Sequence, residues 1–398
     1  MSRACLFGGV GMHMEKTTNL LIIGAGPYGL AMAAYARHLR VDHVIVGMPM
    51  DFWKANMPKG MYLRSASDWH LDPLGLYTIE KFLEIQGLTA GDIEPLSLQF
   101  YLAYAQWFQE QKQISPLPVL VQRLDWADGN YGRFRAAMAN GETLSAQHVV
   151  IAVGFKYFKY LPPELAERLP AGRYMHTCDL VDFRHLEGKH CLILGGRQSA
   201  FEWTALLNDA GSAAVHLSYR HDTPAFHRAD MSWIAPMVDA MIDDPAWFRR
   251  LSQEERDAVI DRFWSVGRLN VEPWLESRVM KETVTLWPRT RVVEADVIAH
   301  DALSVRLDNG RTLTVDTIIL ATGYRVQIDQ VRFLARGNIL DGLAMHNGFP
   351  ILDEHFQTNI PGLFITSMPA TRDFGPFFGF TVAVGTAAKL MGRAMVGR

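Results

Sequence analysis

The sequence predicts an α/β fold with two Rossmann-like dinucleotide-binding domains, the second inserted in the first. Two glycine-rich turns, Gly24-Ala25-Gly26-Pro27-Tyr28-Gly29 and Gly195-Gly196-Arg197-Gln198-Ser199-Ala200, each follow a short apolar segment and precede a helical stretch. An Asn-Gly hairpin that leads into an apolar strand ending in glycine also occurs twice, at residues 140–154 and 309–323. Both features recur after about 170 residues, which indicates an internal duplication.

Length and composition exclude several classes of protein. A chain of 398 residues is long enough for two or three domains, and 49% apolar with 20% charged residues is typical of a globular protein. The 39 basic and 42 acidic residues give a net charge of −3, so nothing indicates binding to nucleic acid or to an anionic membrane. The uncharged segments 20–36 and 374–388 are too short or too rich in glycine to span a bilayer.

The cysteines are few and scattered. Cys5, Cys178 and Cys191 form no C-x-x-C pair, which argues against both a disulfide framework and a redox dithiol. We therefore expect a protein of the reducing cytoplasm, with Cys178 and Cys191 as buried thiols.

The first glycine turn has the G-x-G-x-x-G spacing between a predicted strand at 20–23 and a predicted helix at 30–36. Gly24 permits a tight turn, Gly26 lets the backbone approach a pyrophosphate, and Gly29 lets the helix pack on the strand. The N–H groups that begin the helix would face the phosphates. A glycine turn without a ligand is the alternative, but the strand–turn–helix context favours dinucleotide binding.

The second turn departs from this pattern at one position. It lies between a predicted strand at 190–194 and a predicted helix at 201–210, and the next strand ends at Arg220. Arg220 stands where a guanidinium would meet a 2′-phosphate, which favours NADPH over NADH. Arg197 occupies the place of the second glycine, so its side chain either crowds the pyrophosphate or turns outward and pairs with it.

Together with Ile319-Leu320-Ala321-Thr322-Gly323-Tyr324, these turns resemble the class B flavin-dependent monooxygenases, which comprise flavin-containing, N-hydroxylating and Baeyer–Villiger enzymes. The resemblance spans about residues 17–395. It implies an FAD-binding domain at 17–160 and 316–398, and an NADPH-binding domain at 161–315 with a helical insertion at about 224–280. Disulfide reductases share this architecture but need a dithiol, which the sequence lacks.

The resemblance also implies the residues that contact the two coenzymes. Trp53 would lie at the flavin edge, and residues 374–376 would open a final helix whose positive end faces the reduced flavin. Gly47 replaces the acidic residue that usually binds a ribose at the end of the second strand. The implied contacts are Gly24, Gly26, Pro27, Tyr28, Gly29, Trp53, Val121, Thr322, Gly323, Phe374, Gly375 and Pro376, and on the nicotinamide side Gly195, Gly196, Arg197, Gln198, Ser199 and Arg220.

The polar and aromatic stretch 61–73 lacks clean periodicity, as is typical of a loop packed on a ligand. The resemblance places it near the reactive face of the flavin. Arg64, Ser65, Trp69 and His70 are therefore the candidate catalytic residues, in contact with substrate or with oxygen bound to the flavin. The alternatives are that Trp69 belongs to the core and that His70 is a surface residue.

Two aromatic clusters have simpler interpretations. Residues 224–280 carry Trp233, Trp247, Phe248, Phe263, Trp264 and Trp274 among charges, which predicts a helical subdomain with its own aromatic core. A cap over the pocket or a dimer face are the alternatives. Phe100, Tyr104, Trp107 and Phe108 share one helix face and should be core; Phe377 and Phe378 line the pocket or belong to the core.

The implied activity is that of an NADPH-consuming monooxygenase. NADPH would reduce FAD, O₂ would add to form a C4a-(hydro)peroxyflavin, and one oxygen atom would pass to a small organic substrate. No metal signature such as H-E-x-x-H is present. Hydroxylation at nitrogen or on a ring is favoured, because only His176 remains of the Baeyer–Villiger signature before the second turn.

Other outcomes stay open at this point. Baeyer–Villiger oxygenation is one alternative, and an FAD-binding oxidoreductase or sensor that never oxygenates is another. The Met-x-Leu-Arg-Ser stretch at 61–65 is similar to that of some urate hydroxylases, but the sequence does not identify the substrate. A homodimer is the expected assembly.

Overall fold

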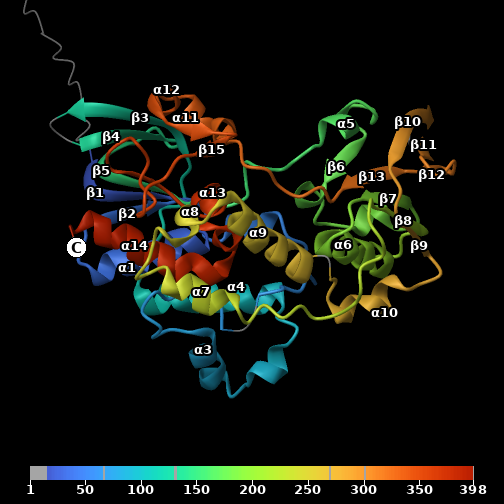
Figure 1. The fold of residues 1–398 in the computed structure, drawn as a ribbon, viewed down its shortest axis with the longest axis horizontal. Helices are drawn as coiled ribbons and strands as arrows, with labels where there is room; N and C mark the ends of the chain where they lie inside the picture. The colour runs from blue at the N-terminus through green and yellow to red at the C-terminus, as the bar shows by residue number, and fades with distance from the viewer. Residues whose placement is uncertain (1–15, 66–67, 130–131, 269, 300–301, 398) are drawn as a thin grey trace, which may run out of the picture.

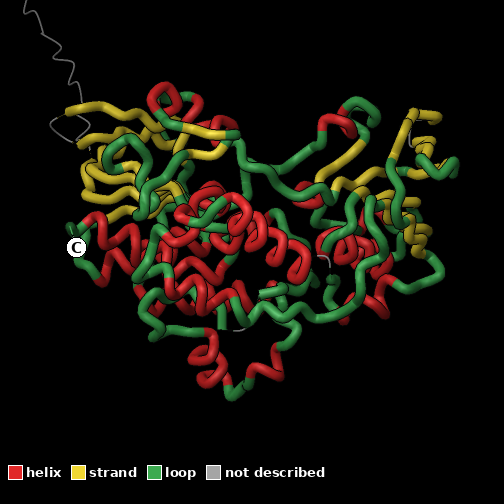
Figure 2. Tube along the Cα trace, viewed as in Figure 1, coloured by secondary structure: helices red, strands yellow, loops and turns green. Residues whose placement is uncertain are grey.

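The computed structural model describes residues 16–397 apart from 66–67, 130–131, 269 and 300–301. Cys5 lies outside this range. The chain forms two lobes, each with its own sheet, and most of the helices lie against the first lobe or between the two (Figure 1). Figure 2 shows the strands gathered at the two ends of the molecule. In the described part of the chain, no helix has both the length and the apolar character needed to cross a bilayer.

The first lobe is built on a sheet that contains the first glycine turn. Its central strands are parallel, and the short strand β16 (Leu363–Ile365) pairs with the second half of β5. The strand order is β2 (His43–Val46), β1 (Lys16–Ile23), β5 (Thr143–Ile151), β4 (Gly132–Met138) and β3 (Val121–Gly129). Residues Leu20–Ile23 are buried, as expected for a parallel strand that is covered on both faces.

The helix after the first turn is α1 (Pro27–His38), which packs on the last helix, α14 (Val384–Met395). Pro27 at its first position is pre-organised for a helix start. Ala33 and most of the other residues up to Ala36 are buried, which explains why this stretch carries no charge. The helix and the strand before it therefore form the rigid base of the first turn.

The second lobe repeats this arrangement with a parallel sheet. The order is β6 (Tyr174–His176), β13 (Thr317–Leu320), β7 (His190–Leu194), β8 (Ala214–Ser218) and β9 (Val284–Trp287), with α6 (Gln198–Asp209) after the second turn. An antiparallel meander follows, consisting of β10 (Val292–Ala299), β11 (Ala302–Leu307) and β12 (Thr312–Val315). Because β13 pairs with β6 and β7, the chain leaves the second lobe after residue 320 and not at 316 as expected.

The duplication predicted from the sequence is visible in the strand pairing. β1 pairs in parallel with β5, and β7 pairs in parallel with β13 in the corresponding place. The Asn-Gly turns that precede β5 and β12 place Gly141 and Gly310 at φ values of 85° and 80°, where glycine is favoured.

The helical segment 224–280 does not have its own core, contrary to expectation. Its first part forms α7 (Ile234–Ala240), α8 (Trp247–Arg250) and α9 (Gln253–Arg268), whose buried side chains join the core of the first lobe. Phe248 lies 6.3 Å from Phe377, and Phe263 lies 5.4 Å from Phe380, between ring centroids. Residues from Val271 to α10 (Glu276–Val279) pack instead on the core of the second lobe. The aromatic residues of α7, α8 and α9 are therefore explained by packing on the core of the first lobe.

The last helix also begins later than expected, at Val384 and not near residue 376. Gly375 has a φ of 95°, and the chain then makes two short 3₁₀ turns, at 376–379 and 381–383, before α14. Of the four residues predicted as the core face of α4 (Leu98–Lys112), Tyr104 and Phe108 are fully buried, whereas Phe100 and Trp107 are partly buried against the same core. The remaining elements are α2 (Asp51–Ala55), α3 (Ile79–Gln86), α5 (Pro163–Ala166), α11 (Arg332–Ala335), α12 (Ile339–Gly342), α13 (Thr371–Phe374), β14 (Met345–His346) and β15 (Phe349–Pro350).

Candidate coenzyme and substrate site

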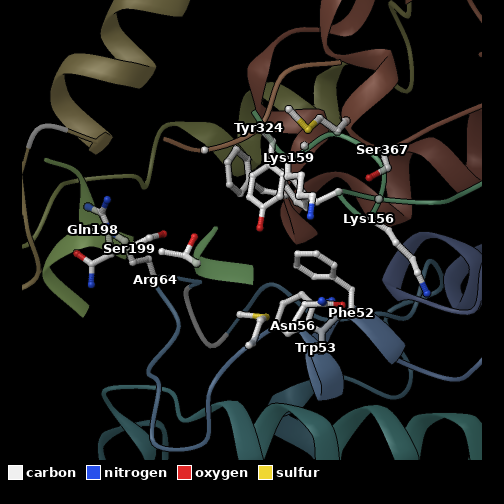
Figure 3. A pocket seen from close by; sticks show the side chains of 18 of the residues that line it. Phe52, Trp53, Asn56, Arg64, Lys156, Lys159, Gln198, Ser199, Tyr324 and Ser367 are labelled. Atoms are coloured by element: carbon white, nitrogen blue, oxygen red, sulfur yellow. The ribbon is translucent and has the colours of Figure 1, made fainter. Parts of the chain in front are cut away.

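One cavity of about 2750 Å³ is lined by residues of both lobes, including both glycine turns. This volume exceeds the 300–1,000 Å³ or so of a typical small-molecule site. It is large enough for two dinucleotides and a substrate. Figure 3 shows Gln198 and Ser199 on one side of this space and Phe52, Trp53 and Asn56 on another.

The first turn has the close contacts that its glycines require. A β-carbon on Gly24, whose φ is 113°, would lie 2.3 Å from the carbonyl oxygen of Ala152. A β-carbon on Gly29 would lie 1.8 Å from the oxygen of Gly24, so helix and strand are in contact there. At Gly26, by contrast, no atom lies within 4 Å of that position. The open space over Gly26 fits a pyrophosphate approaching the backbone.

The second turn reproduces this geometry with a side chain added. Gly195 has a φ of 145°, and its β-carbon would lie 2.5 Å from the oxygen of Ala321. Arg197 and Gly26 each precede the first turn of a helix, with extended backbone angles of −108°, −177° and −86°, −169°. Any residue can adopt this conformation, so Arg197 is tolerated without strain. Its guanidinium lies 4.7 Å from the ring centroid of Trp264 and so points toward α9.

Both helix N-termini at the cavity are free to bind an anion. Neither α1 nor α6 has a side chain that caps its first N–H groups. These groups carry a partial positive charge and attract phosphate. Each glycine turn, together with the first N–H groups of the helix after it, therefore offers a binding site for phosphate, which we call a phosphate cradle.

Two arginines add positive charge beside the second cradle. Arg197 and Arg220 both line the cavity, and neither forms an ion pair with a carboxylate of the described residues. Burial, and then the nearby charge of Arg220, lower the pKa of Arg197. Two guanidinium groups that repel each other without a carboxylate partner fit a site for phosphate oxygens.

The predicted residues of the first lobe mostly reach the cavity. Trp53 lines it and stacks on Tyr101, with 4.8 Å between ring centroids, and Val121 lines it from the start of β3. Tyr28 donates hydrogen bonds to the carbonyl oxygens of Phe378 and Phe380, which fixes the turn against the C-terminal segment. Of the predicted coenzyme contacts, those that line the cavity are Gly24, Gly26, Pro27, Tyr28, Trp53, Val121, Thr322, Gly323, Gly195, Gly196, Arg197, Gln198, Ser199 and Arg220.

The assignment of the C-terminal segment has to be corrected. Phe374, Gly375 and Pro376 are not among the lining residues; Phe374 is fully buried and stacks on Phe356, with ring centroids 3.7 Å apart. Phe377 and Phe378 likewise belong to the core. The segment reaches the cavity a few residues later, at Gly379–Val382, because the last helix starts beyond the two 3₁₀ turns.

The four candidate catalytic residues separate into two groups. Arg64, Ser65 and Trp69 line the cavity, and Ser65 lies 3.4 Å from the hydroxyl of Thr381. His70 does not line it; its Nδ1 is buried without a hydrogen bond to any described residue, and burial lowers the pKa of the imidazole. His70 is partly exposed and is not among the residues that line the cavity, unlike the other three candidates.

Several lining residues were not predicted. Asn56, Lys159 and Tyr324 face the space between the turns in Figure 3, and Glu272 forms an ion pair with Arg64, with 2.8 Å between Oε1 and Nε. Glu272 lies 208 positions from Arg64 in a loop without any motif, so no local signal links the two. Tyr324 belongs to the predicted 319–324 segment, and its aromatic character was the available signal.

Gly47 and the acidic residue Asp51 both line the cavity shortly after the end of β2. Gly47 has a φ of 127°, and a β-carbon there would lie 3.2 Å from the amide nitrogen of Ala25, so a side chain is disfavoured. Asp51, at the start of α2, lines the same part of the cavity and pairs with Lys156 at 2.5 Å.

The chemistry of the cysteines is that of buried thiols. Cys178 and Cys191 are free and buried, as predicted, and burial raises the pKa of each thiol to about 11. Neither lines the cavity. Among the described residues, no group of three or more His, Cys, Asp or Glu side chains is placed to hold a metal ion.

Two sheets with parallel central strands, two glycine turns with uncapped helices and one shared cavity define a protein of the two-dinucleotide-binding-domain class. Residues 18–366 match the family described as pyridine nucleotide-disulphide oxidoreductase, so the chain belongs to that family. It lacks a dithiol at the cavity among its described residues, unlike the disulfide reductases from which the family takes its name.

Sequence relatives include two bacterial oxidoreductases. The chain is 27% identical over 216 residues to an FAD-dependent urate hydroxylase of Xanthomonas campestris, covering 51% of this chain and 45% of that protein. It thus spans less than half the length of that relative. It is 23% identical to a CzcO-like oxidoreductase of Geobacillus kaustophilus, covering 89% of this chain and 92% of that protein.

A solved structure confirms the fold. The ornithine N-hydroxylase of Kutzneria sp. 744 superposes with a TM-score of 0.78 at 15% identity, covering 96% of this chain and 99% of that chain. The two-Rossmann architecture predicted from the sequence is therefore shown, and with it the resemblance to the fold of flavin-dependent monooxygenases.

Proposed function

We propose that this protein is an FAD-dependent monooxygenase that consumes NADPH and O₂ and inserts one oxygen atom into a small organic substrate. The observation that carries the proposal is that both phosphate cradles open onto one cavity. A hydride donor held at α6 and a flavin held at α1 share that space. When bound, the two coenzymes supply the redox chemistry, and the protein supplies binding and orientation.

The residues of the chain have definite tasks in this proposal. The first N–H groups of α1 and α6 bind the two pyrophosphates, and Arg220 binds the 2′-phosphate that distinguishes NADPH from NADH. Trp53 packs against the ring system of the flavin, supported from behind by Tyr101. Tyr62 and Trp274 line the cavity, with 6.0 Å between their ring centroids. These aromatic side chains exclude water from their part of the cavity.

We assign the reaction to hydroxylation at nitrogen or on a ring. The relatives found by sequence and by structure include a urate hydroxylase and an ornithine N-hydroxylase, whose names describe hydroxylations. The Baeyer–Villiger signature is missing before the second turn. The two buried thiols fit a reducing compartment, and we place the enzyme in the cytoplasm, as a homodimer.

A direct test measures flavin reduction by NADPH and the transfer of oxygen to a substrate. Purified protein should be yellow, and anaerobic NADPH should bleach the flavin absorbance. In air, a screen of amines, amino acids and purines by mass spectrometry should find a product that has gained one oxygen atom, with little hydrogen peroxide released. NADPH oxidation that reduces only added acceptors such as ferricyanide, with no oxygenated product, would instead support the non-oxygenating oxidoreductase. Protein that binds no FAD contradicts both.

A further inference from the structure

A closed ring of hydrogen bonds joins the two lobes at the wall of the cavity. The backbone N–H of Tyr62 donates to Oε1 of Glu202 at 3.2 Å, and Gln198 Nε2 donates to Oε2 of Glu202 at 3.3 Å. Gln198 Oε1 accepts from the N–H of Glu272 at 3.1 Å, and Glu272 Oε1 accepts from Arg64 Nε at 2.8 Å. Tyr62 and Arg64 belong to one loop, which closes the ring.

The side chains that form the ring are buried or nearly so. Glu202, Glu272 and Gln198 are 0%, 5% and 6% exposed, and the side chain of Arg64 is 13% exposed. Two of them belong to α6, the helix that begins at the second phosphate cradle. The position of Arg64 in the first lobe is therefore set by a helix of the second.

One donor of the ring has no acceptor. Nη1 of Arg64 is buried and makes no hydrogen bond to any described residue. Buried donors on a charged group are almost always satisfied, and an oxygen of a molecule bound in the cavity would satisfy this one. Arg64 lines the cavity, and Figure 3 shows it beside Gln198 and Ser199.

We propose that Glu272 is a positioning residue, which holds the Arg64 guanidinium so that Nη1 donates to a carbonyl-type oxygen of a bound reactant. This inference rests on the proposed function and adds a residue to it. The acceptor is a neutral oxygen because the charges are already balanced: Glu272 pairs with Arg64 at 2.8 Å, and Asp209 pairs with Arg278 at 2.7 Å. The nicotinamide carboxamide and a substrate carbonyl are the two sources of such an oxygen.

The test compares Glu272→Gln, Glu272→Ala and Arg64→Lys with a matched control, Glu294→Gln. Glu294 also pairs with an arginine, Arg306, at 2.6 Å, but that pair is exposed and neither residue lines the cavity. FAD content and thermal unfolding midpoint report on folding. Binding of NADP⁺ and of thionicotinamide-NADP⁺, whose sulfur is a poor acceptor, is measured by quenching of tryptophan fluorescence. The rate of anaerobic flavin reduction by NADPH is measured by stopped flow.

We expect Glu272→Ala and Arg64→Lys to slow flavin reduction or weaken NADP⁺ binding about tenfold. Glu272→Gln should lie between these variants and wild type, and Glu294→Gln should be unchanged. The double variant should lose no more than either single one, because both act through the same guanidinium. If the carboxamide is the acceptor, wild type prefers NADP⁺ over its thio analogue and Glu272→Ala loses the preference. A loss of coupling between NADPH oxidation and oxygenation, with binding and reduction intact, points to the substrate.

Wild-type rates, binding and coupling in Glu272→Ala overturn the inference, as does an equal effect of Glu294→Gln. Failure of the proposed function is distinguishable from this result. It shows as wild-type protein that binds FAD and NADP⁺ but forms no oxygenated product, whereas the preference between the two nucleotides is measured by binding alone.

Discussion

The carbonyl oxygen of Ala152 lies against the α-carbon of Gly24, so close that a β-carbon would be 2.3 Å away. Ala321 and Gly195 repeat this relationship in the second lobe at 2.5 Å. In both lobes the residue that follows a central parallel strand, β5 or β13, is thus in close contact with the first glycine of the turn. The contact fixes where the turn opens onto the cavity.

Two glycines of the first turn should respond differently to alanine. Gly24→Ala places a methyl group on the Ala152 carbonyl and forces an unfavourable φ, so the variant should lose several kcal/mol of folding free energy. Gly26→Ala meets no atom within 4 Å, so it should fold normally but bind FAD at least about tenfold more weakly, because the methyl group occupies the pyrophosphate position. Circular dichroism and FAD titration measure the two effects. Unchanged FAD affinity in Gly26→Ala contradicts this use of the turn.

A second pair of glycines tests the packing of α1. Gly29→Ala puts a β-carbon 1.8 Å from the oxygen of Gly24, and we expect it to destabilise the protein by about 3 kcal/mol or more. Gly385→Ala in α14 is the control: its nearest neighbour is the α-carbon of Pro73 at 3.6 Å, an ordinary contact, so alanine should be neutral or stabilise by up to about 1 kcal/mol. Urea unfolding of both variants gives the comparison. Equal stabilities would mean that helix and strand are not in contact.

Arg220 should set the choice of nicotinamide coenzyme. Arg220→Gln removes a guanidinium that has no carboxylate partner among the described residues, so stability should change little. The KM for NADPH should rise about tenfold or more, while that for NADH should stay the same, because only NADPH carries the 2′-phosphate. Steady-state oxidation of the two coenzymes measures the ratio. A parallel loss with both coenzymes would place Arg220 on the pyrophosphate instead.

The loop that carries Arg64 and Trp69 should depend on a buried ion pair. Asp72 is 1% exposed, accepts from Lys112 at 2.9 Å and from the backbone N–H groups of Leu74, Leu76 and Tyr77. Asp72→Asn leaves a buried ammonium without its partner and should cost about 3 kcal/mol of folding free energy. Glu84→Gln, which breaks an exposed pair with Lys81, should cost well under about 1 kcal/mol. Similar losses in both variants would remove the special role of Asp72.

The pH dependence of stability should show the protonation of Glu202. Burial raises the pKa of this carboxyl to about 7 from its usual 4.5. The native state therefore holds the proton over a pH range in which the unfolded state has released it, so the contribution of Glu202 to the free energy of unfolding falls as pH rises from about 4.5 to 7.

Glu202→Gln removes this contribution. Relative to wild type it should gain about 2 kcal/mol between pH 5 and pH 8, a difference in which the other titrating groups cancel. Urea unfolding at four or five pH values measures it. A difference that does not vary with pH would show that the native carboxyl ionises normally.

Much of the fold follows from local sequence signals. The strand–turn–helix units at Gly24 and Gly195 are specified within about ten residues by glycine spacing and apolar runs, and both form as predicted. The helix predicted at 376 failed because Gly375 adopts a φ of 95° and diverts the chain into two 3₁₀ turns. A proline after a glycine looks the same in sequence whether it starts a helix or a turn.

The site was harder to predict, because its parts meet only in three dimensions. Arg64 was identified as a candidate from its loop, but its partner Glu272 comes from a distant segment on which no motif points to a role. The aromatic residues of 224–280 were recognised as packing residues, whereas the surface they pack on was not. Periodicity shows that a face is buried but does not show against what.

The path of residues 224–280 has a consequence for how this protein can be made. The chain enters the second lobe, sends α7, α8 and α9 back onto the first, and returns before it completes β9. Neither lobe is formed by one continuous segment of the chain. Removing the segment of one lobe would expose apolar side chains of the other. During synthesis on the ribosome, the face of α1 that packs on α14 therefore stays exposed until α14 has emerged.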